Sequence, residues 1–276
     1  MPELPEVETV RRGVAAAAAG RRIRAVHVGR EDVTRGTAAA VRAQAGGRLH
    51  AVARHGKQLA LVTDTGPAAA VHLGMSGTLT AAATGPAADR PRHVHVVWCL
   101  EGGLELRFRD PRRFGGVRGY ADLAALRRER WANLGPDALT VGPADLHRRL
   151  GRTGRGLKAA LLDQQLVAGL GNIYVDELLF GARLHPGVRA CGLPRPAAAG
   201  LVRRMRTLLG RAVAAGGSSL RDHVGADGAA GAFQRSHRVY GRAGRPCRRC
   251  RTPLDSGTFA GRTTVWCPRC QPPGGR

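Results

Sequence analysis

Residues 92–110 read RHVHVVWCLEGGLELRFRD, and this stretch decides the architecture of the first half of the chain. Val94, Val96 and Trp98 fall on one face of an extended segment, which predicts a strand in a sheet packed on one side. Residues 101–103 supply the turn, because consecutive glycines tolerate the positive φ angles of tight hairpins. The sequence therefore predicts a β-hairpin here.

Further β-rich runs lie ahead of this hairpin, and no helical stretch interrupts them. They are IRAVHV at residues 23–28, LALVTD at 59–64 and AVHLGMSGTLT at 70–80. Several such strands in succession favour an antiparallel sandwich or barrel. At the start of the chain, Val7, Val10 and Val14 recur at helical spacing, so we expect the chain to open with a helix.

The six cysteines divide into two pairs and two single residues. The pairs have the spacing C-x2-C-x16-C-x2-C and are Cys247, Cys250, Cys267 and Cys270. Two such pairs predict one tetrahedral Zn²⁺ site, and four protein thiolates leave no open position, so the zinc is expected to be structural. The single residues, Cys99 and Cys191, are expected to be buried.

The charge of the chain points to a polyanionic partner. The formal net charge is +24 and the pI is about 11.6. Residues 201–276 contain 15 arginines against three aspartates, so half of the net charge lies in about a quarter of the chain. Such clustering favours a nucleic-acid-binding surface over an evenly solvated one. No stretch resembles a signal peptide or a membrane-spanning helix, so we expect a cytoplasmic protein.

Lysine is rare here, since the chain has 42 arginines and only two lysines, Lys57 and Lys158. Lysine can lose its proton and guanidinium cannot, so either lysine is a candidate for a chemical role. Chance retention of a lysine codon is the alternative.

The first residues, MPELPEVE, place a proline and a glutamate just before the predicted helix. After removal of Met1, Pro2 would carry a free secondary amine beside the carboxylate of Glu3. Such an amine can attack a sugar carbon and become an iminium, which makes Pro2 a candidate covalent catalyst. The alternative is that Met-Pro is only a common start.

Two loops have the residue types of a DNA contact. GLGN at residues 169–172 can bring backbone N–H groups to a phosphate, or it can be an ordinary glycine-capped turn. Asn172 could cap the next helix or donate to a phosphate. DPRRFGG at residues 110–116 presents Arg112 and Phe114, a cation beside an aromatic wedge that suits insertion into a base stack. A core phenylalanine beside solvated arginines is the alternative.

Seven segments together resemble the formamidopyrimidine-DNA glycosylase and endonuclease VIII family of base-excision repair enzymes. In order they are PELPEVETVRRG, HLGMSG, DPRRFGG, LLDQQLVAGLGNIYVDELLF, GGSSLRDHVGADG, VYGRAG and CRRC followed by CPRCQ. The resemblance implies an α+β multidomain fold: an N-terminal antiparallel β-sandwich with flanking helices, a helix-two-turn-helix domain and a C-terminal zinc ribbon. We expect a catalytic domain at residues 1–130, a linker at 131–156, the helix-two-turn-helix domain with its lesion loop at 157–238 and the ribbon at 239–276.

The resemblance also implies a bifunctional glycosylase and abasic-site lyase for 8-oxoguanine and formamidopyrimidines. Pro2 looks like the nucleophile that attacks C1′ and forms a Schiff base, and Glu3 looks like the acid/base. Lys57 matches the family's catalytic β-hairpin lysine, and Arg262 matches the proton donor in β,δ-elimination. The implied protein is a bacterial, cytoplasmic monomer that associates with the nucleoid through double-stranded DNA containing oxidised bases or abasic sites.

The remaining matched positions are DNA contacts. The residues implied to bind the phosphate backbone of DNA are His72, Lys158, Asn172 and Arg262. Those implied to fill the hole left by base flipping are Met75, Arg112 and Phe114. The lesion loop runs from residue 218 to 233 and includes Ser218, Ser219 and Arg221.

Three departures from the family pattern leave the lesion range open. His223 stands where a tyrosine is usual in the family. The segment GADGAAGAFQ at residues 225–234 has smaller side chains than most family members, and RHGKQLAL replaces the common RRGKYLLL. An endonuclease VIII-like enzyme for oxidised pyrimidines is one alternative. A non-catalytic DNA-binding zinc-ribbon protein is another, but its signature would be loss of Pro2, Glu3 or Lys57.

Overall fold

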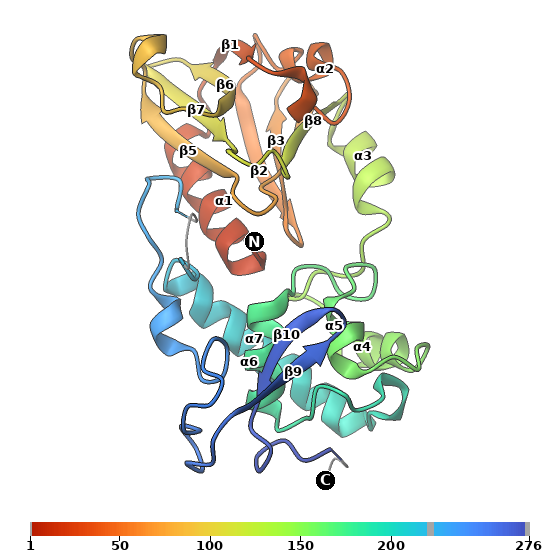
Figure 1. Cartoon of the computed structure of the whole chain (residues 1–276). Coiled ribbons are helices and arrows are strands. Elements are labelled where there is room, and N and C mark those ends of the chain that lie inside the picture. Colours follow the sequence, from red (N-terminus) through yellow and green to blue (C-terminus); the bar gives the residue numbers. More distant parts are fainter. Residues whose placement is uncertain (1, 220–223, 274–276) are drawn as a thin grey trace. The chain divides into compact units, whose positions relative to one another are not determined.

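The computed structural model describes residues 2–219 and 224–273, which form two compact units (Figure 1). The first comprises Met1–Asn133 and Val213–Gln234, and the second comprises Leu134–Ala212 and Arg235–Arg276. This division differs from the expected domains, because residues 213–219 and 224–234 pack with the N-terminal unit. Residues 134–156 belong to the second unit and include a helix, Pro143–Leu150, that buries Leu146 and Leu150 instead of forming a linker.

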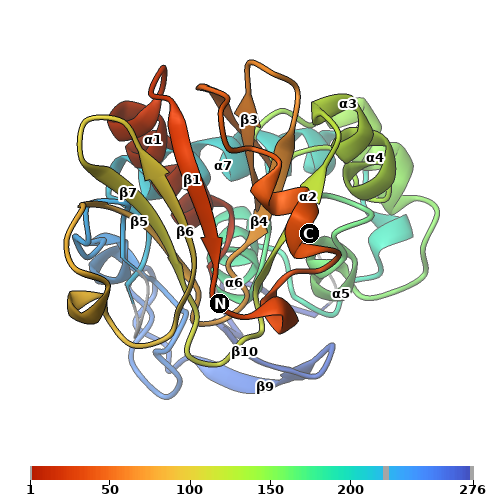
Figure 2. The same ribbon diagram turned by 90° about the horizontal axis from the view of Figure 1, so that it is seen from above.

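The first unit is an antiparallel β-sandwich, as expected. One sheet has the order β1-β6-β7-β5 and the other β2-β3-β4-β8 (Figures 1 and 2). The strands of the first sheet are β1 (Ile23–Val28), β6 (Val94–Leu100), β7 (Leu104–Arg109) and β5 (Thr78–Ala83). Those of the second are β2 (Leu49–His55), β3 (Gln58–Thr63), β4 (Ala68–His72) and β8 (Gly116–Tyr120).

Helices flank the sandwich within this unit. They are α1 (Leu4–Ala18), α2 (Ala38–Arg42) and α3 (Leu123–Leu126), which continues as a π-helical turn at Arg127–Trp131; short 3-10 turns lie at Glu31–Val33 and Ala87–Asp89. The predicted first helix is confirmed, since Val7, Val10 and Val14 of α1 are buried in a core formed with both sheets. That core fixes α1 to the sandwich through apolar burial.

The hairpin at residues 92–110 is confirmed as β6 and β7, with Gly102 and Gly103 at φ angles of 76° and 68°. The prediction of a sheet packed on one side is wrong for β6, because Val97 is only 4% exposed. On this face, two arginines pair with the buried Glu105 of β7. Arg90 and Arg107 donate to the Glu105 carboxylate at 2.6 and 2.7 Å.

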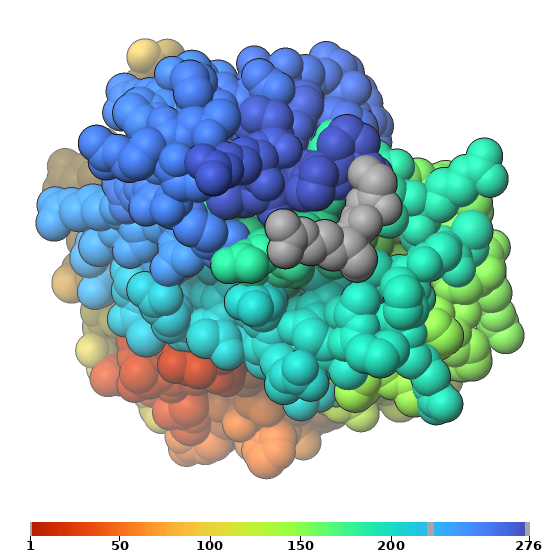
Figure 3. All heavy atoms as spheres, turned by 90° about the horizontal axis from the view of Figure 1, so that it is seen from below, coloured from red at the N-terminus to blue at the C-terminus, as the bar shows by residue number. Residues whose placement is uncertain are grey.

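The second unit is helical and ends in a β-ribbon. Its elements are α4 (Pro143–Leu150), α5 (Leu157–Leu162), α6 (Asn172–Ala182), α7 (Arg195–Ala214), β9 (Asp255–Phe259) and β10 (Arg262–Trp266), with a 3-10 turn at Ala190–Gly192. Another 3-10 turn, Phe233–Ser236, begins in the first unit and ends in the second. Residues 163–171 form the two turns between α5 and α6. Phe180 of α6 packs with the buried Val239, Leu254 and Val265 of the ribbon segment. In the space-filling view, ribbon residues in blue lie against the teal helical residues of the same unit (Figure 3).

None of the helices in the described part of the chain has both the length and the apolar composition that a membrane span requires.

Candidate active site and zinc centre

The start of α1 fixes the two residues predicted to be catalytic. Glu3 is the N-cap of α1 and forms a capping box with Glu6, whose carboxylate accepts the backbone N–H of Glu3 at 2.8 Å. Pro5 occupies the first turn, where a missing N–H costs no helical hydrogen bond. Glu3 is only 3% exposed. The capping box therefore gives Glu3, and with it Pro2, one defined position at the helix start.

An ion pair and a hydrogen bond to a backbone carbonyl connect α1 to the turn that carries Lys57. Glu8 of α1 accepts from Arg54 of β2 at 2.9 Å, and Arg54 also donates to the carbonyl oxygen of Gly56 at 2.9 Å. Gly56 has a φ of 55° and precedes the largely buried Lys57 in the β2–β3 turn. Burial would raise the pKa of Glu8, but hydrogen bonds from Arg11, Arg12 and Arg54 lower it to about 2.

His72, at the end of β4, lies opposite Gln58 in the pairing of β3 with β4 and hence next to the Lys57 turn. Burial lowers the pKa of His72 to about 4, and the positive charges of Arg130 and Lys57 act in the same direction. The imidazole is therefore neutral near pH 7. Its Nδ1 accepts the N–H of Gly74 at 3.2 Å, which leaves the ring proton on Nε2 as a donor.

Met75 and Phe114 are the large apolar side chains that the described surface exposes most, at 45% and 53%. The guanidinium carbon of Arg112 lies 4.6 Å from the centroid of the Phe114 ring. Phe114 is thus not a core residue, which removes the alternative interpretation of DPRRFGG. An exposed aromatic ring beside a cation has the form of a wedge for a base stack.

Asp110 holds the two loops that carry these side chains, and the sequence interpretation gave it no role. Its buried carboxylate accepts from the Ser76 hydroxyl at 2.6 Å and from the backbone N–H of Gly115 at 2.8 Å. The loops approach so closely that a Cβ on Gly74 would lie 2.3 Å from the nitrogen of Gly115. The only sequence signal was the occurrence of Ser76 and Asp110 within the quoted motifs HLGMSG and DPRRFGG.

In the second unit, Asn172 lies beside the strand that begins with Arg262. The side-chain amide of Asn172 donates to the carbonyl oxygen of Thr263 at 3.0 Å, and Arg262 is exposed. Asn172 does not cap α6, because Gly171 is the N-cap. The buried Oδ1 of Asn172 has no hydrogen-bond partner among the residues that the structure describes. The geometry brings together two of the side chains predicted to bind phosphate.

Lys158 differs from its expected role in DNA binding. Its side chain is fully buried, and the ammonium donates to Asp176 Oδ1 at 2.6 Å and to the Thr264 hydroxyl at 2.7 Å. Asp176 also accepts the backbone N–H of Val265 at 3.2 Å. Burial raises the pKa of Asp176 to about 6, against the opposing effect of Lys158. Lys158 therefore connects α5 and α6 to β10 and has no exposed surface with which to contact a phosphate.

A neighbouring carboxylate on α6 holds the start of the ribbon segment. Glu177 is 5% exposed, and its Oε1 accepts the backbone N–H groups of Arg238, Val239 and Tyr240 at 2.8 to 2.9 Å. Desolvation raises the pKa of Glu177, and these backbone hydrogen bonds oppose the shift. Two adjacent carboxylates of one helix thus stabilise the start of the ribbon segment and its strand β10.

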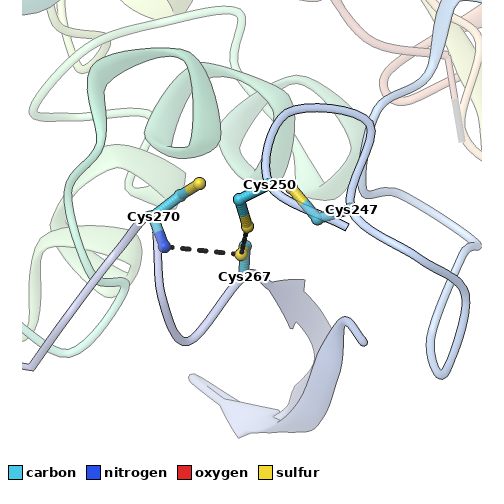
Figure 4. A group of neighbouring side chains, drawn as sticks. All are labelled: Cys247, Cys250, Cys267 and Cys270. Atoms are coloured by element: carbon cyan, nitrogen blue, oxygen red, sulfur yellow. Dashed lines mark hydrogen bonds between the residues drawn. The ribbon is translucent and has the colours of Figure 1, made fainter. Parts of the chain in front are cut away.

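The four paired cysteines form the predicted metal centre (Figure 4). Their Sγ atoms all lie within 4.8 Å of one another, and Cys247 and Cys267 are buried. Four thiolates around Zn²⁺ at about 2.3 Å are separated by roughly 3.8 Å, so the cluster fits one tetrahedral zinc. Of the other cysteines, Cys99 is half-buried, whereas Cys191 is exposed and not buried as expected.

The predicted lesion-loop residues lie partly within the described chain. Ser218 is 4% exposed, and its backbone N–H donates to Glu6 Oε1 at 2.7 Å. The hydroxyl of Ser219 accepts the N–H of Gly231 at 2.8 Å. Arg221 and His223 lie outside the described residues.

Three family models match consecutive parts of the chain. They are the formamidopyrimidine-DNA glycosylase N-terminal domain at residues 1–117, the formamidopyrimidine-DNA glycosylase H2TH domain at 134–224, and the zinc finger found in FPG and IleRS at 244–273. The last match and the cysteine cluster together identify a zinc-binding ribbon.

Curated relatives match over almost the whole length. The chain is 43% identical to the formamidopyrimidine-DNA glycosylase of Geobacillus kaustophilus, covering 98% of this chain and 100% of the relative. It is 41% identical to that of Acidothermus cellulolyticus, covering 99% and 98%.

Solved structures agree with the fold. The crystal structure of the MutM (Fpg) protein of Thermus thermophilus has a TM-score of 0.85 at 40% identity, covering 98% of both chains. A complex of wild-type Lactococcus lactis Fpg with DNA containing N7-benzyl-Fapy-dG has a TM-score of 0.88 at 31% identity, covering 98% of this chain and 100% of that one. The chain belongs to the formamidopyrimidine-DNA glycosylase family.

Proposed function

We propose that this protein is a bifunctional DNA glycosylase and abasic-site lyase that removes 8-oxoguanine and formamidopyrimidines from double-stranded DNA. The observation that carries the proposal is the capping box of α1, which gives Glu3 a defined position directly after Pro2. Removal of Met1 would turn Pro2 into a secondary amine at that position. The Lactococcus lactis relative was crystallised with DNA containing a formamidopyrimidine lesion, which supports the substrate class.

The reaction follows from a secondary amine beside a carboxyl group. The Pro2 nitrogen attacks C1′ as the damaged base leaves with the electrons of the glycosidic bond, and the proton that the Pro2 nitrogen then releases neutralises the departing base. Glu3 protonates the sugar ring oxygen as the ring opens, which leaves an iminium between Pro2 and C1′. Loss of a C2′ proton expels the 3′ phosphate by β-elimination, and δ-elimination then expels the 5′ phosphate. Arg262 is proposed to supply a proton in the elimination steps.

The exposure and hydrogen bonds of the site residues support the proposed DNA contacts. Neutral His72 can donate from Nε2 to a phosphate oxygen, with Lys57 as a fixed positive charge beside it. Asn172 and Arg262 are proposed as a second pair of phosphate donors. Met75, Arg112 and Phe114 are proposed to enter the space that the flipped nucleotide leaves in the stack.

The two alternative functions, an endonuclease VIII-like enzyme and a non-catalytic DNA-binding protein, predict different results in an excision assay. An endonuclease VIII-like enzyme would excise thymine glycol faster than 8-oxoguanine when both duplexes compete. A non-catalytic DNA-binding protein would bind the duplexes and release no base.

The test compares the enzyme with Pro2→Gly and Glu3→Gln. Both variants should retain duplex binding and lose base release, because binding and chemistry depend on different side chains. Equal base release by the wild type and Glu3→Gln would remove Glu3 from the mechanism.

A further inference from the structure

One face of α1 contacts the segment 213–234 at two points. Glu6 Oε1 accepts the backbone N–H of Ser218 at 2.7 Å. Seven residues further on, a Cβ built on Gly13 would lie 2.7 Å from the Cβ of Ala226. Seven residues are nearly two helical turns, so both contacts lie on the same face of α1, about 10 Å apart along its axis.

Ala226 is a packed residue and not part of a loosely exposed loop. It is 3% exposed and belongs to the same hydrophobic core as Val10 and Val14 of α1. Its carbonyl oxygen accepts the N–H of Ala81 at 2.8 Å, a group on the edge strand β5. The backbone turn at Gly225 is closed by a hydrogen bond to Ala229 at 2.8 Å. The methyl group of Ala226 therefore fills a position that exists because Gly13 has no side chain.

Both contacts lie within the lesion segment, residues 218–233. Ser218 makes the contact with Glu6 at the start of the segment, and Ala226 lies eight residues further along the chain. Hydrogen bonds from Gly231 to Ser219 and from Ser219 to Gln234, at 2.8 and 3.2 Å, connect the two ends of the segment. Displacing Ala226 from α1 would thus shift the backbone around Ser218 and Ser219.

We propose that Gly13 is a positioning residue for lesion recognition, because it provides the docking position of Ala226 and, with the contact of Glu6 to Ser218, holds the lesion segment against α1 at two points. The inference rests on the proposed function, in which the segment 218–233 contacts the damaged base. An abasic site carries no base, so cleavage at an abasic site does not require this segment in place. Substitution of Gly13 should therefore lower the rate of base excision and leave the rate of abasic-site cleavage unchanged.

A role in helix packing alone predicts a different result. Alanine is a better helix former than glycine, so Gly13→Ala should not weaken α1 by itself. If Gly13 served only the packing of the unit, any loss of activity would affect both substrates equally and would accompany a lower melting temperature.

The experiment compares the wild type with Gly13→Ala, Ala226→Gly and the double variant. Single-turnover rates are measured on a duplex with 8-oxoguanine and on one with a preformed abasic site. For Gly13→Ala we expect excision to fall about tenfold and abasic-site cleavage to stay within about twofold. The double variant should excise faster than Gly13→Ala, because removing the Ala226 methyl restores the space.

Gly210→Ala on α7 is the matched control, since a Cβ there would meet no described heavy atom within 4 Å. Both activities should be unchanged in this control. The proposal is overturned if Gly13→Ala excises at the wild-type rate, if both activities fall together, or if the double variant is no faster than Gly13→Ala. If the wild type itself fails to excise 8-oxoguanine, the proposed function fails instead.

Discussion

The two units position their candidate DNA-binding side chains by different means. In the first, Met75 and Phe114 lie on loops held by hydrogen bonds to one buried carboxylate, Asp110. In the second, Arg262 lies on a strand held by a metal centre and by the buried Lys158–Asp176 pair. Hydrogen-bonded loops can be disturbed one at a time, whereas a metal centre holds its whole ribbon. The comparison predicts that a substitution in the first unit disturbs only the loop it touches. A substitution at the metal centre of the second unit should unfold the whole ribbon.

The largest effect is expected from loss of zinc. A structural Zn²⁺ site contributes about 10 kcal/mol to the folding of a small metal-binding domain. Cys250→Ser, or removal of zinc by a chelator, should unfold the ribbon and lower duplex affinity at least about tenfold, because Arg262 loses its fixed position. Zinc content and duplex binding are the measurements. Cys191→Ser, at an exposed position outside the cluster, is the control and should behave as the wild type.

Lys158→Met tests whether the second unit depends on its buried ion pair. The substitution leaves the Asp176 carboxylate buried without its ammonium partner, which costs about 3–5 kcal/mol. The free energy of unfolding should fall by that amount. The double variant, Lys158→Met with Asp176→Leu, should regain much of the lost stability.

The salt dependence of duplex binding distinguishes Lys158 from a phosphate contact. Arg262→Ala should reduce the slope of log affinity against log salt by about one unit, and Lys158→Met should leave the slope unchanged if the protein is still folded. A lower slope for Lys158→Met would mean that Lys158 binds a phosphate after all.

Acid should weaken the contact between α1 and the Lys57 turn. The pKa of Glu8 is about 2 in the folded protein, below the ordinary 4.5. A carboxyl group with a lowered folded pKa stabilises the fold above its unfolded pKa and loses that contribution as the pH falls from about 4.5 to 2. The contribution is on the order of 3 kcal/mol.

Unfolding of the wild type and Glu8→Gln between pH 6 and 2 measures this contribution. The variant should be less stable at pH 6 and show a flatter pH profile. Glu129→Gln, at an exposed position, is the control. Identical profiles for Glu8→Gln and the wild type would contradict the role of Glu8.

Asp110→Asn is expected to have the smallest effect and the most local one. An amide can accept one hydrogen bond from Ser76 or Gly115 but loses the charge that strengthens both, at about 1–3 kcal/mol. Excision should slow because Met75 and Phe114 lose their fixed loops, while zinc content and the salt slope stay at wild-type values. A change in either of those would show that the units are not independent.

Local patterns predicted much of this molecule. The β6–β7 hairpin followed from alternation and two glycines, and the zinc centre followed from cysteine spacing, because both depend on residues close in sequence. The resemblance placed Lys158 among the DNA contacts, and its burial could not be foreseen because its partner Thr264 lies 106 residues away. The docking of residues 213–234 on α1 depends on a contact between residues 212 positions apart, Glu6 and Ser218. Such pairings are set by tertiary packing and leave no periodic signal.

The central claim is that Pro2 is the nucleophile. It is tested most directly by borohydride reduction of the enzyme on a duplex with 8-oxoguanine opposite cytosine, followed by mass mapping of the cross-linked peptide. The account predicts DNA attached to a peptide that begins at Pro2, and a strongly reduced yield of this adduct for Pro2→Gly. Binding of the duplex without an adduct, together with failure to trap an abasic-site duplex, would contradict the catalytic role of Pro2.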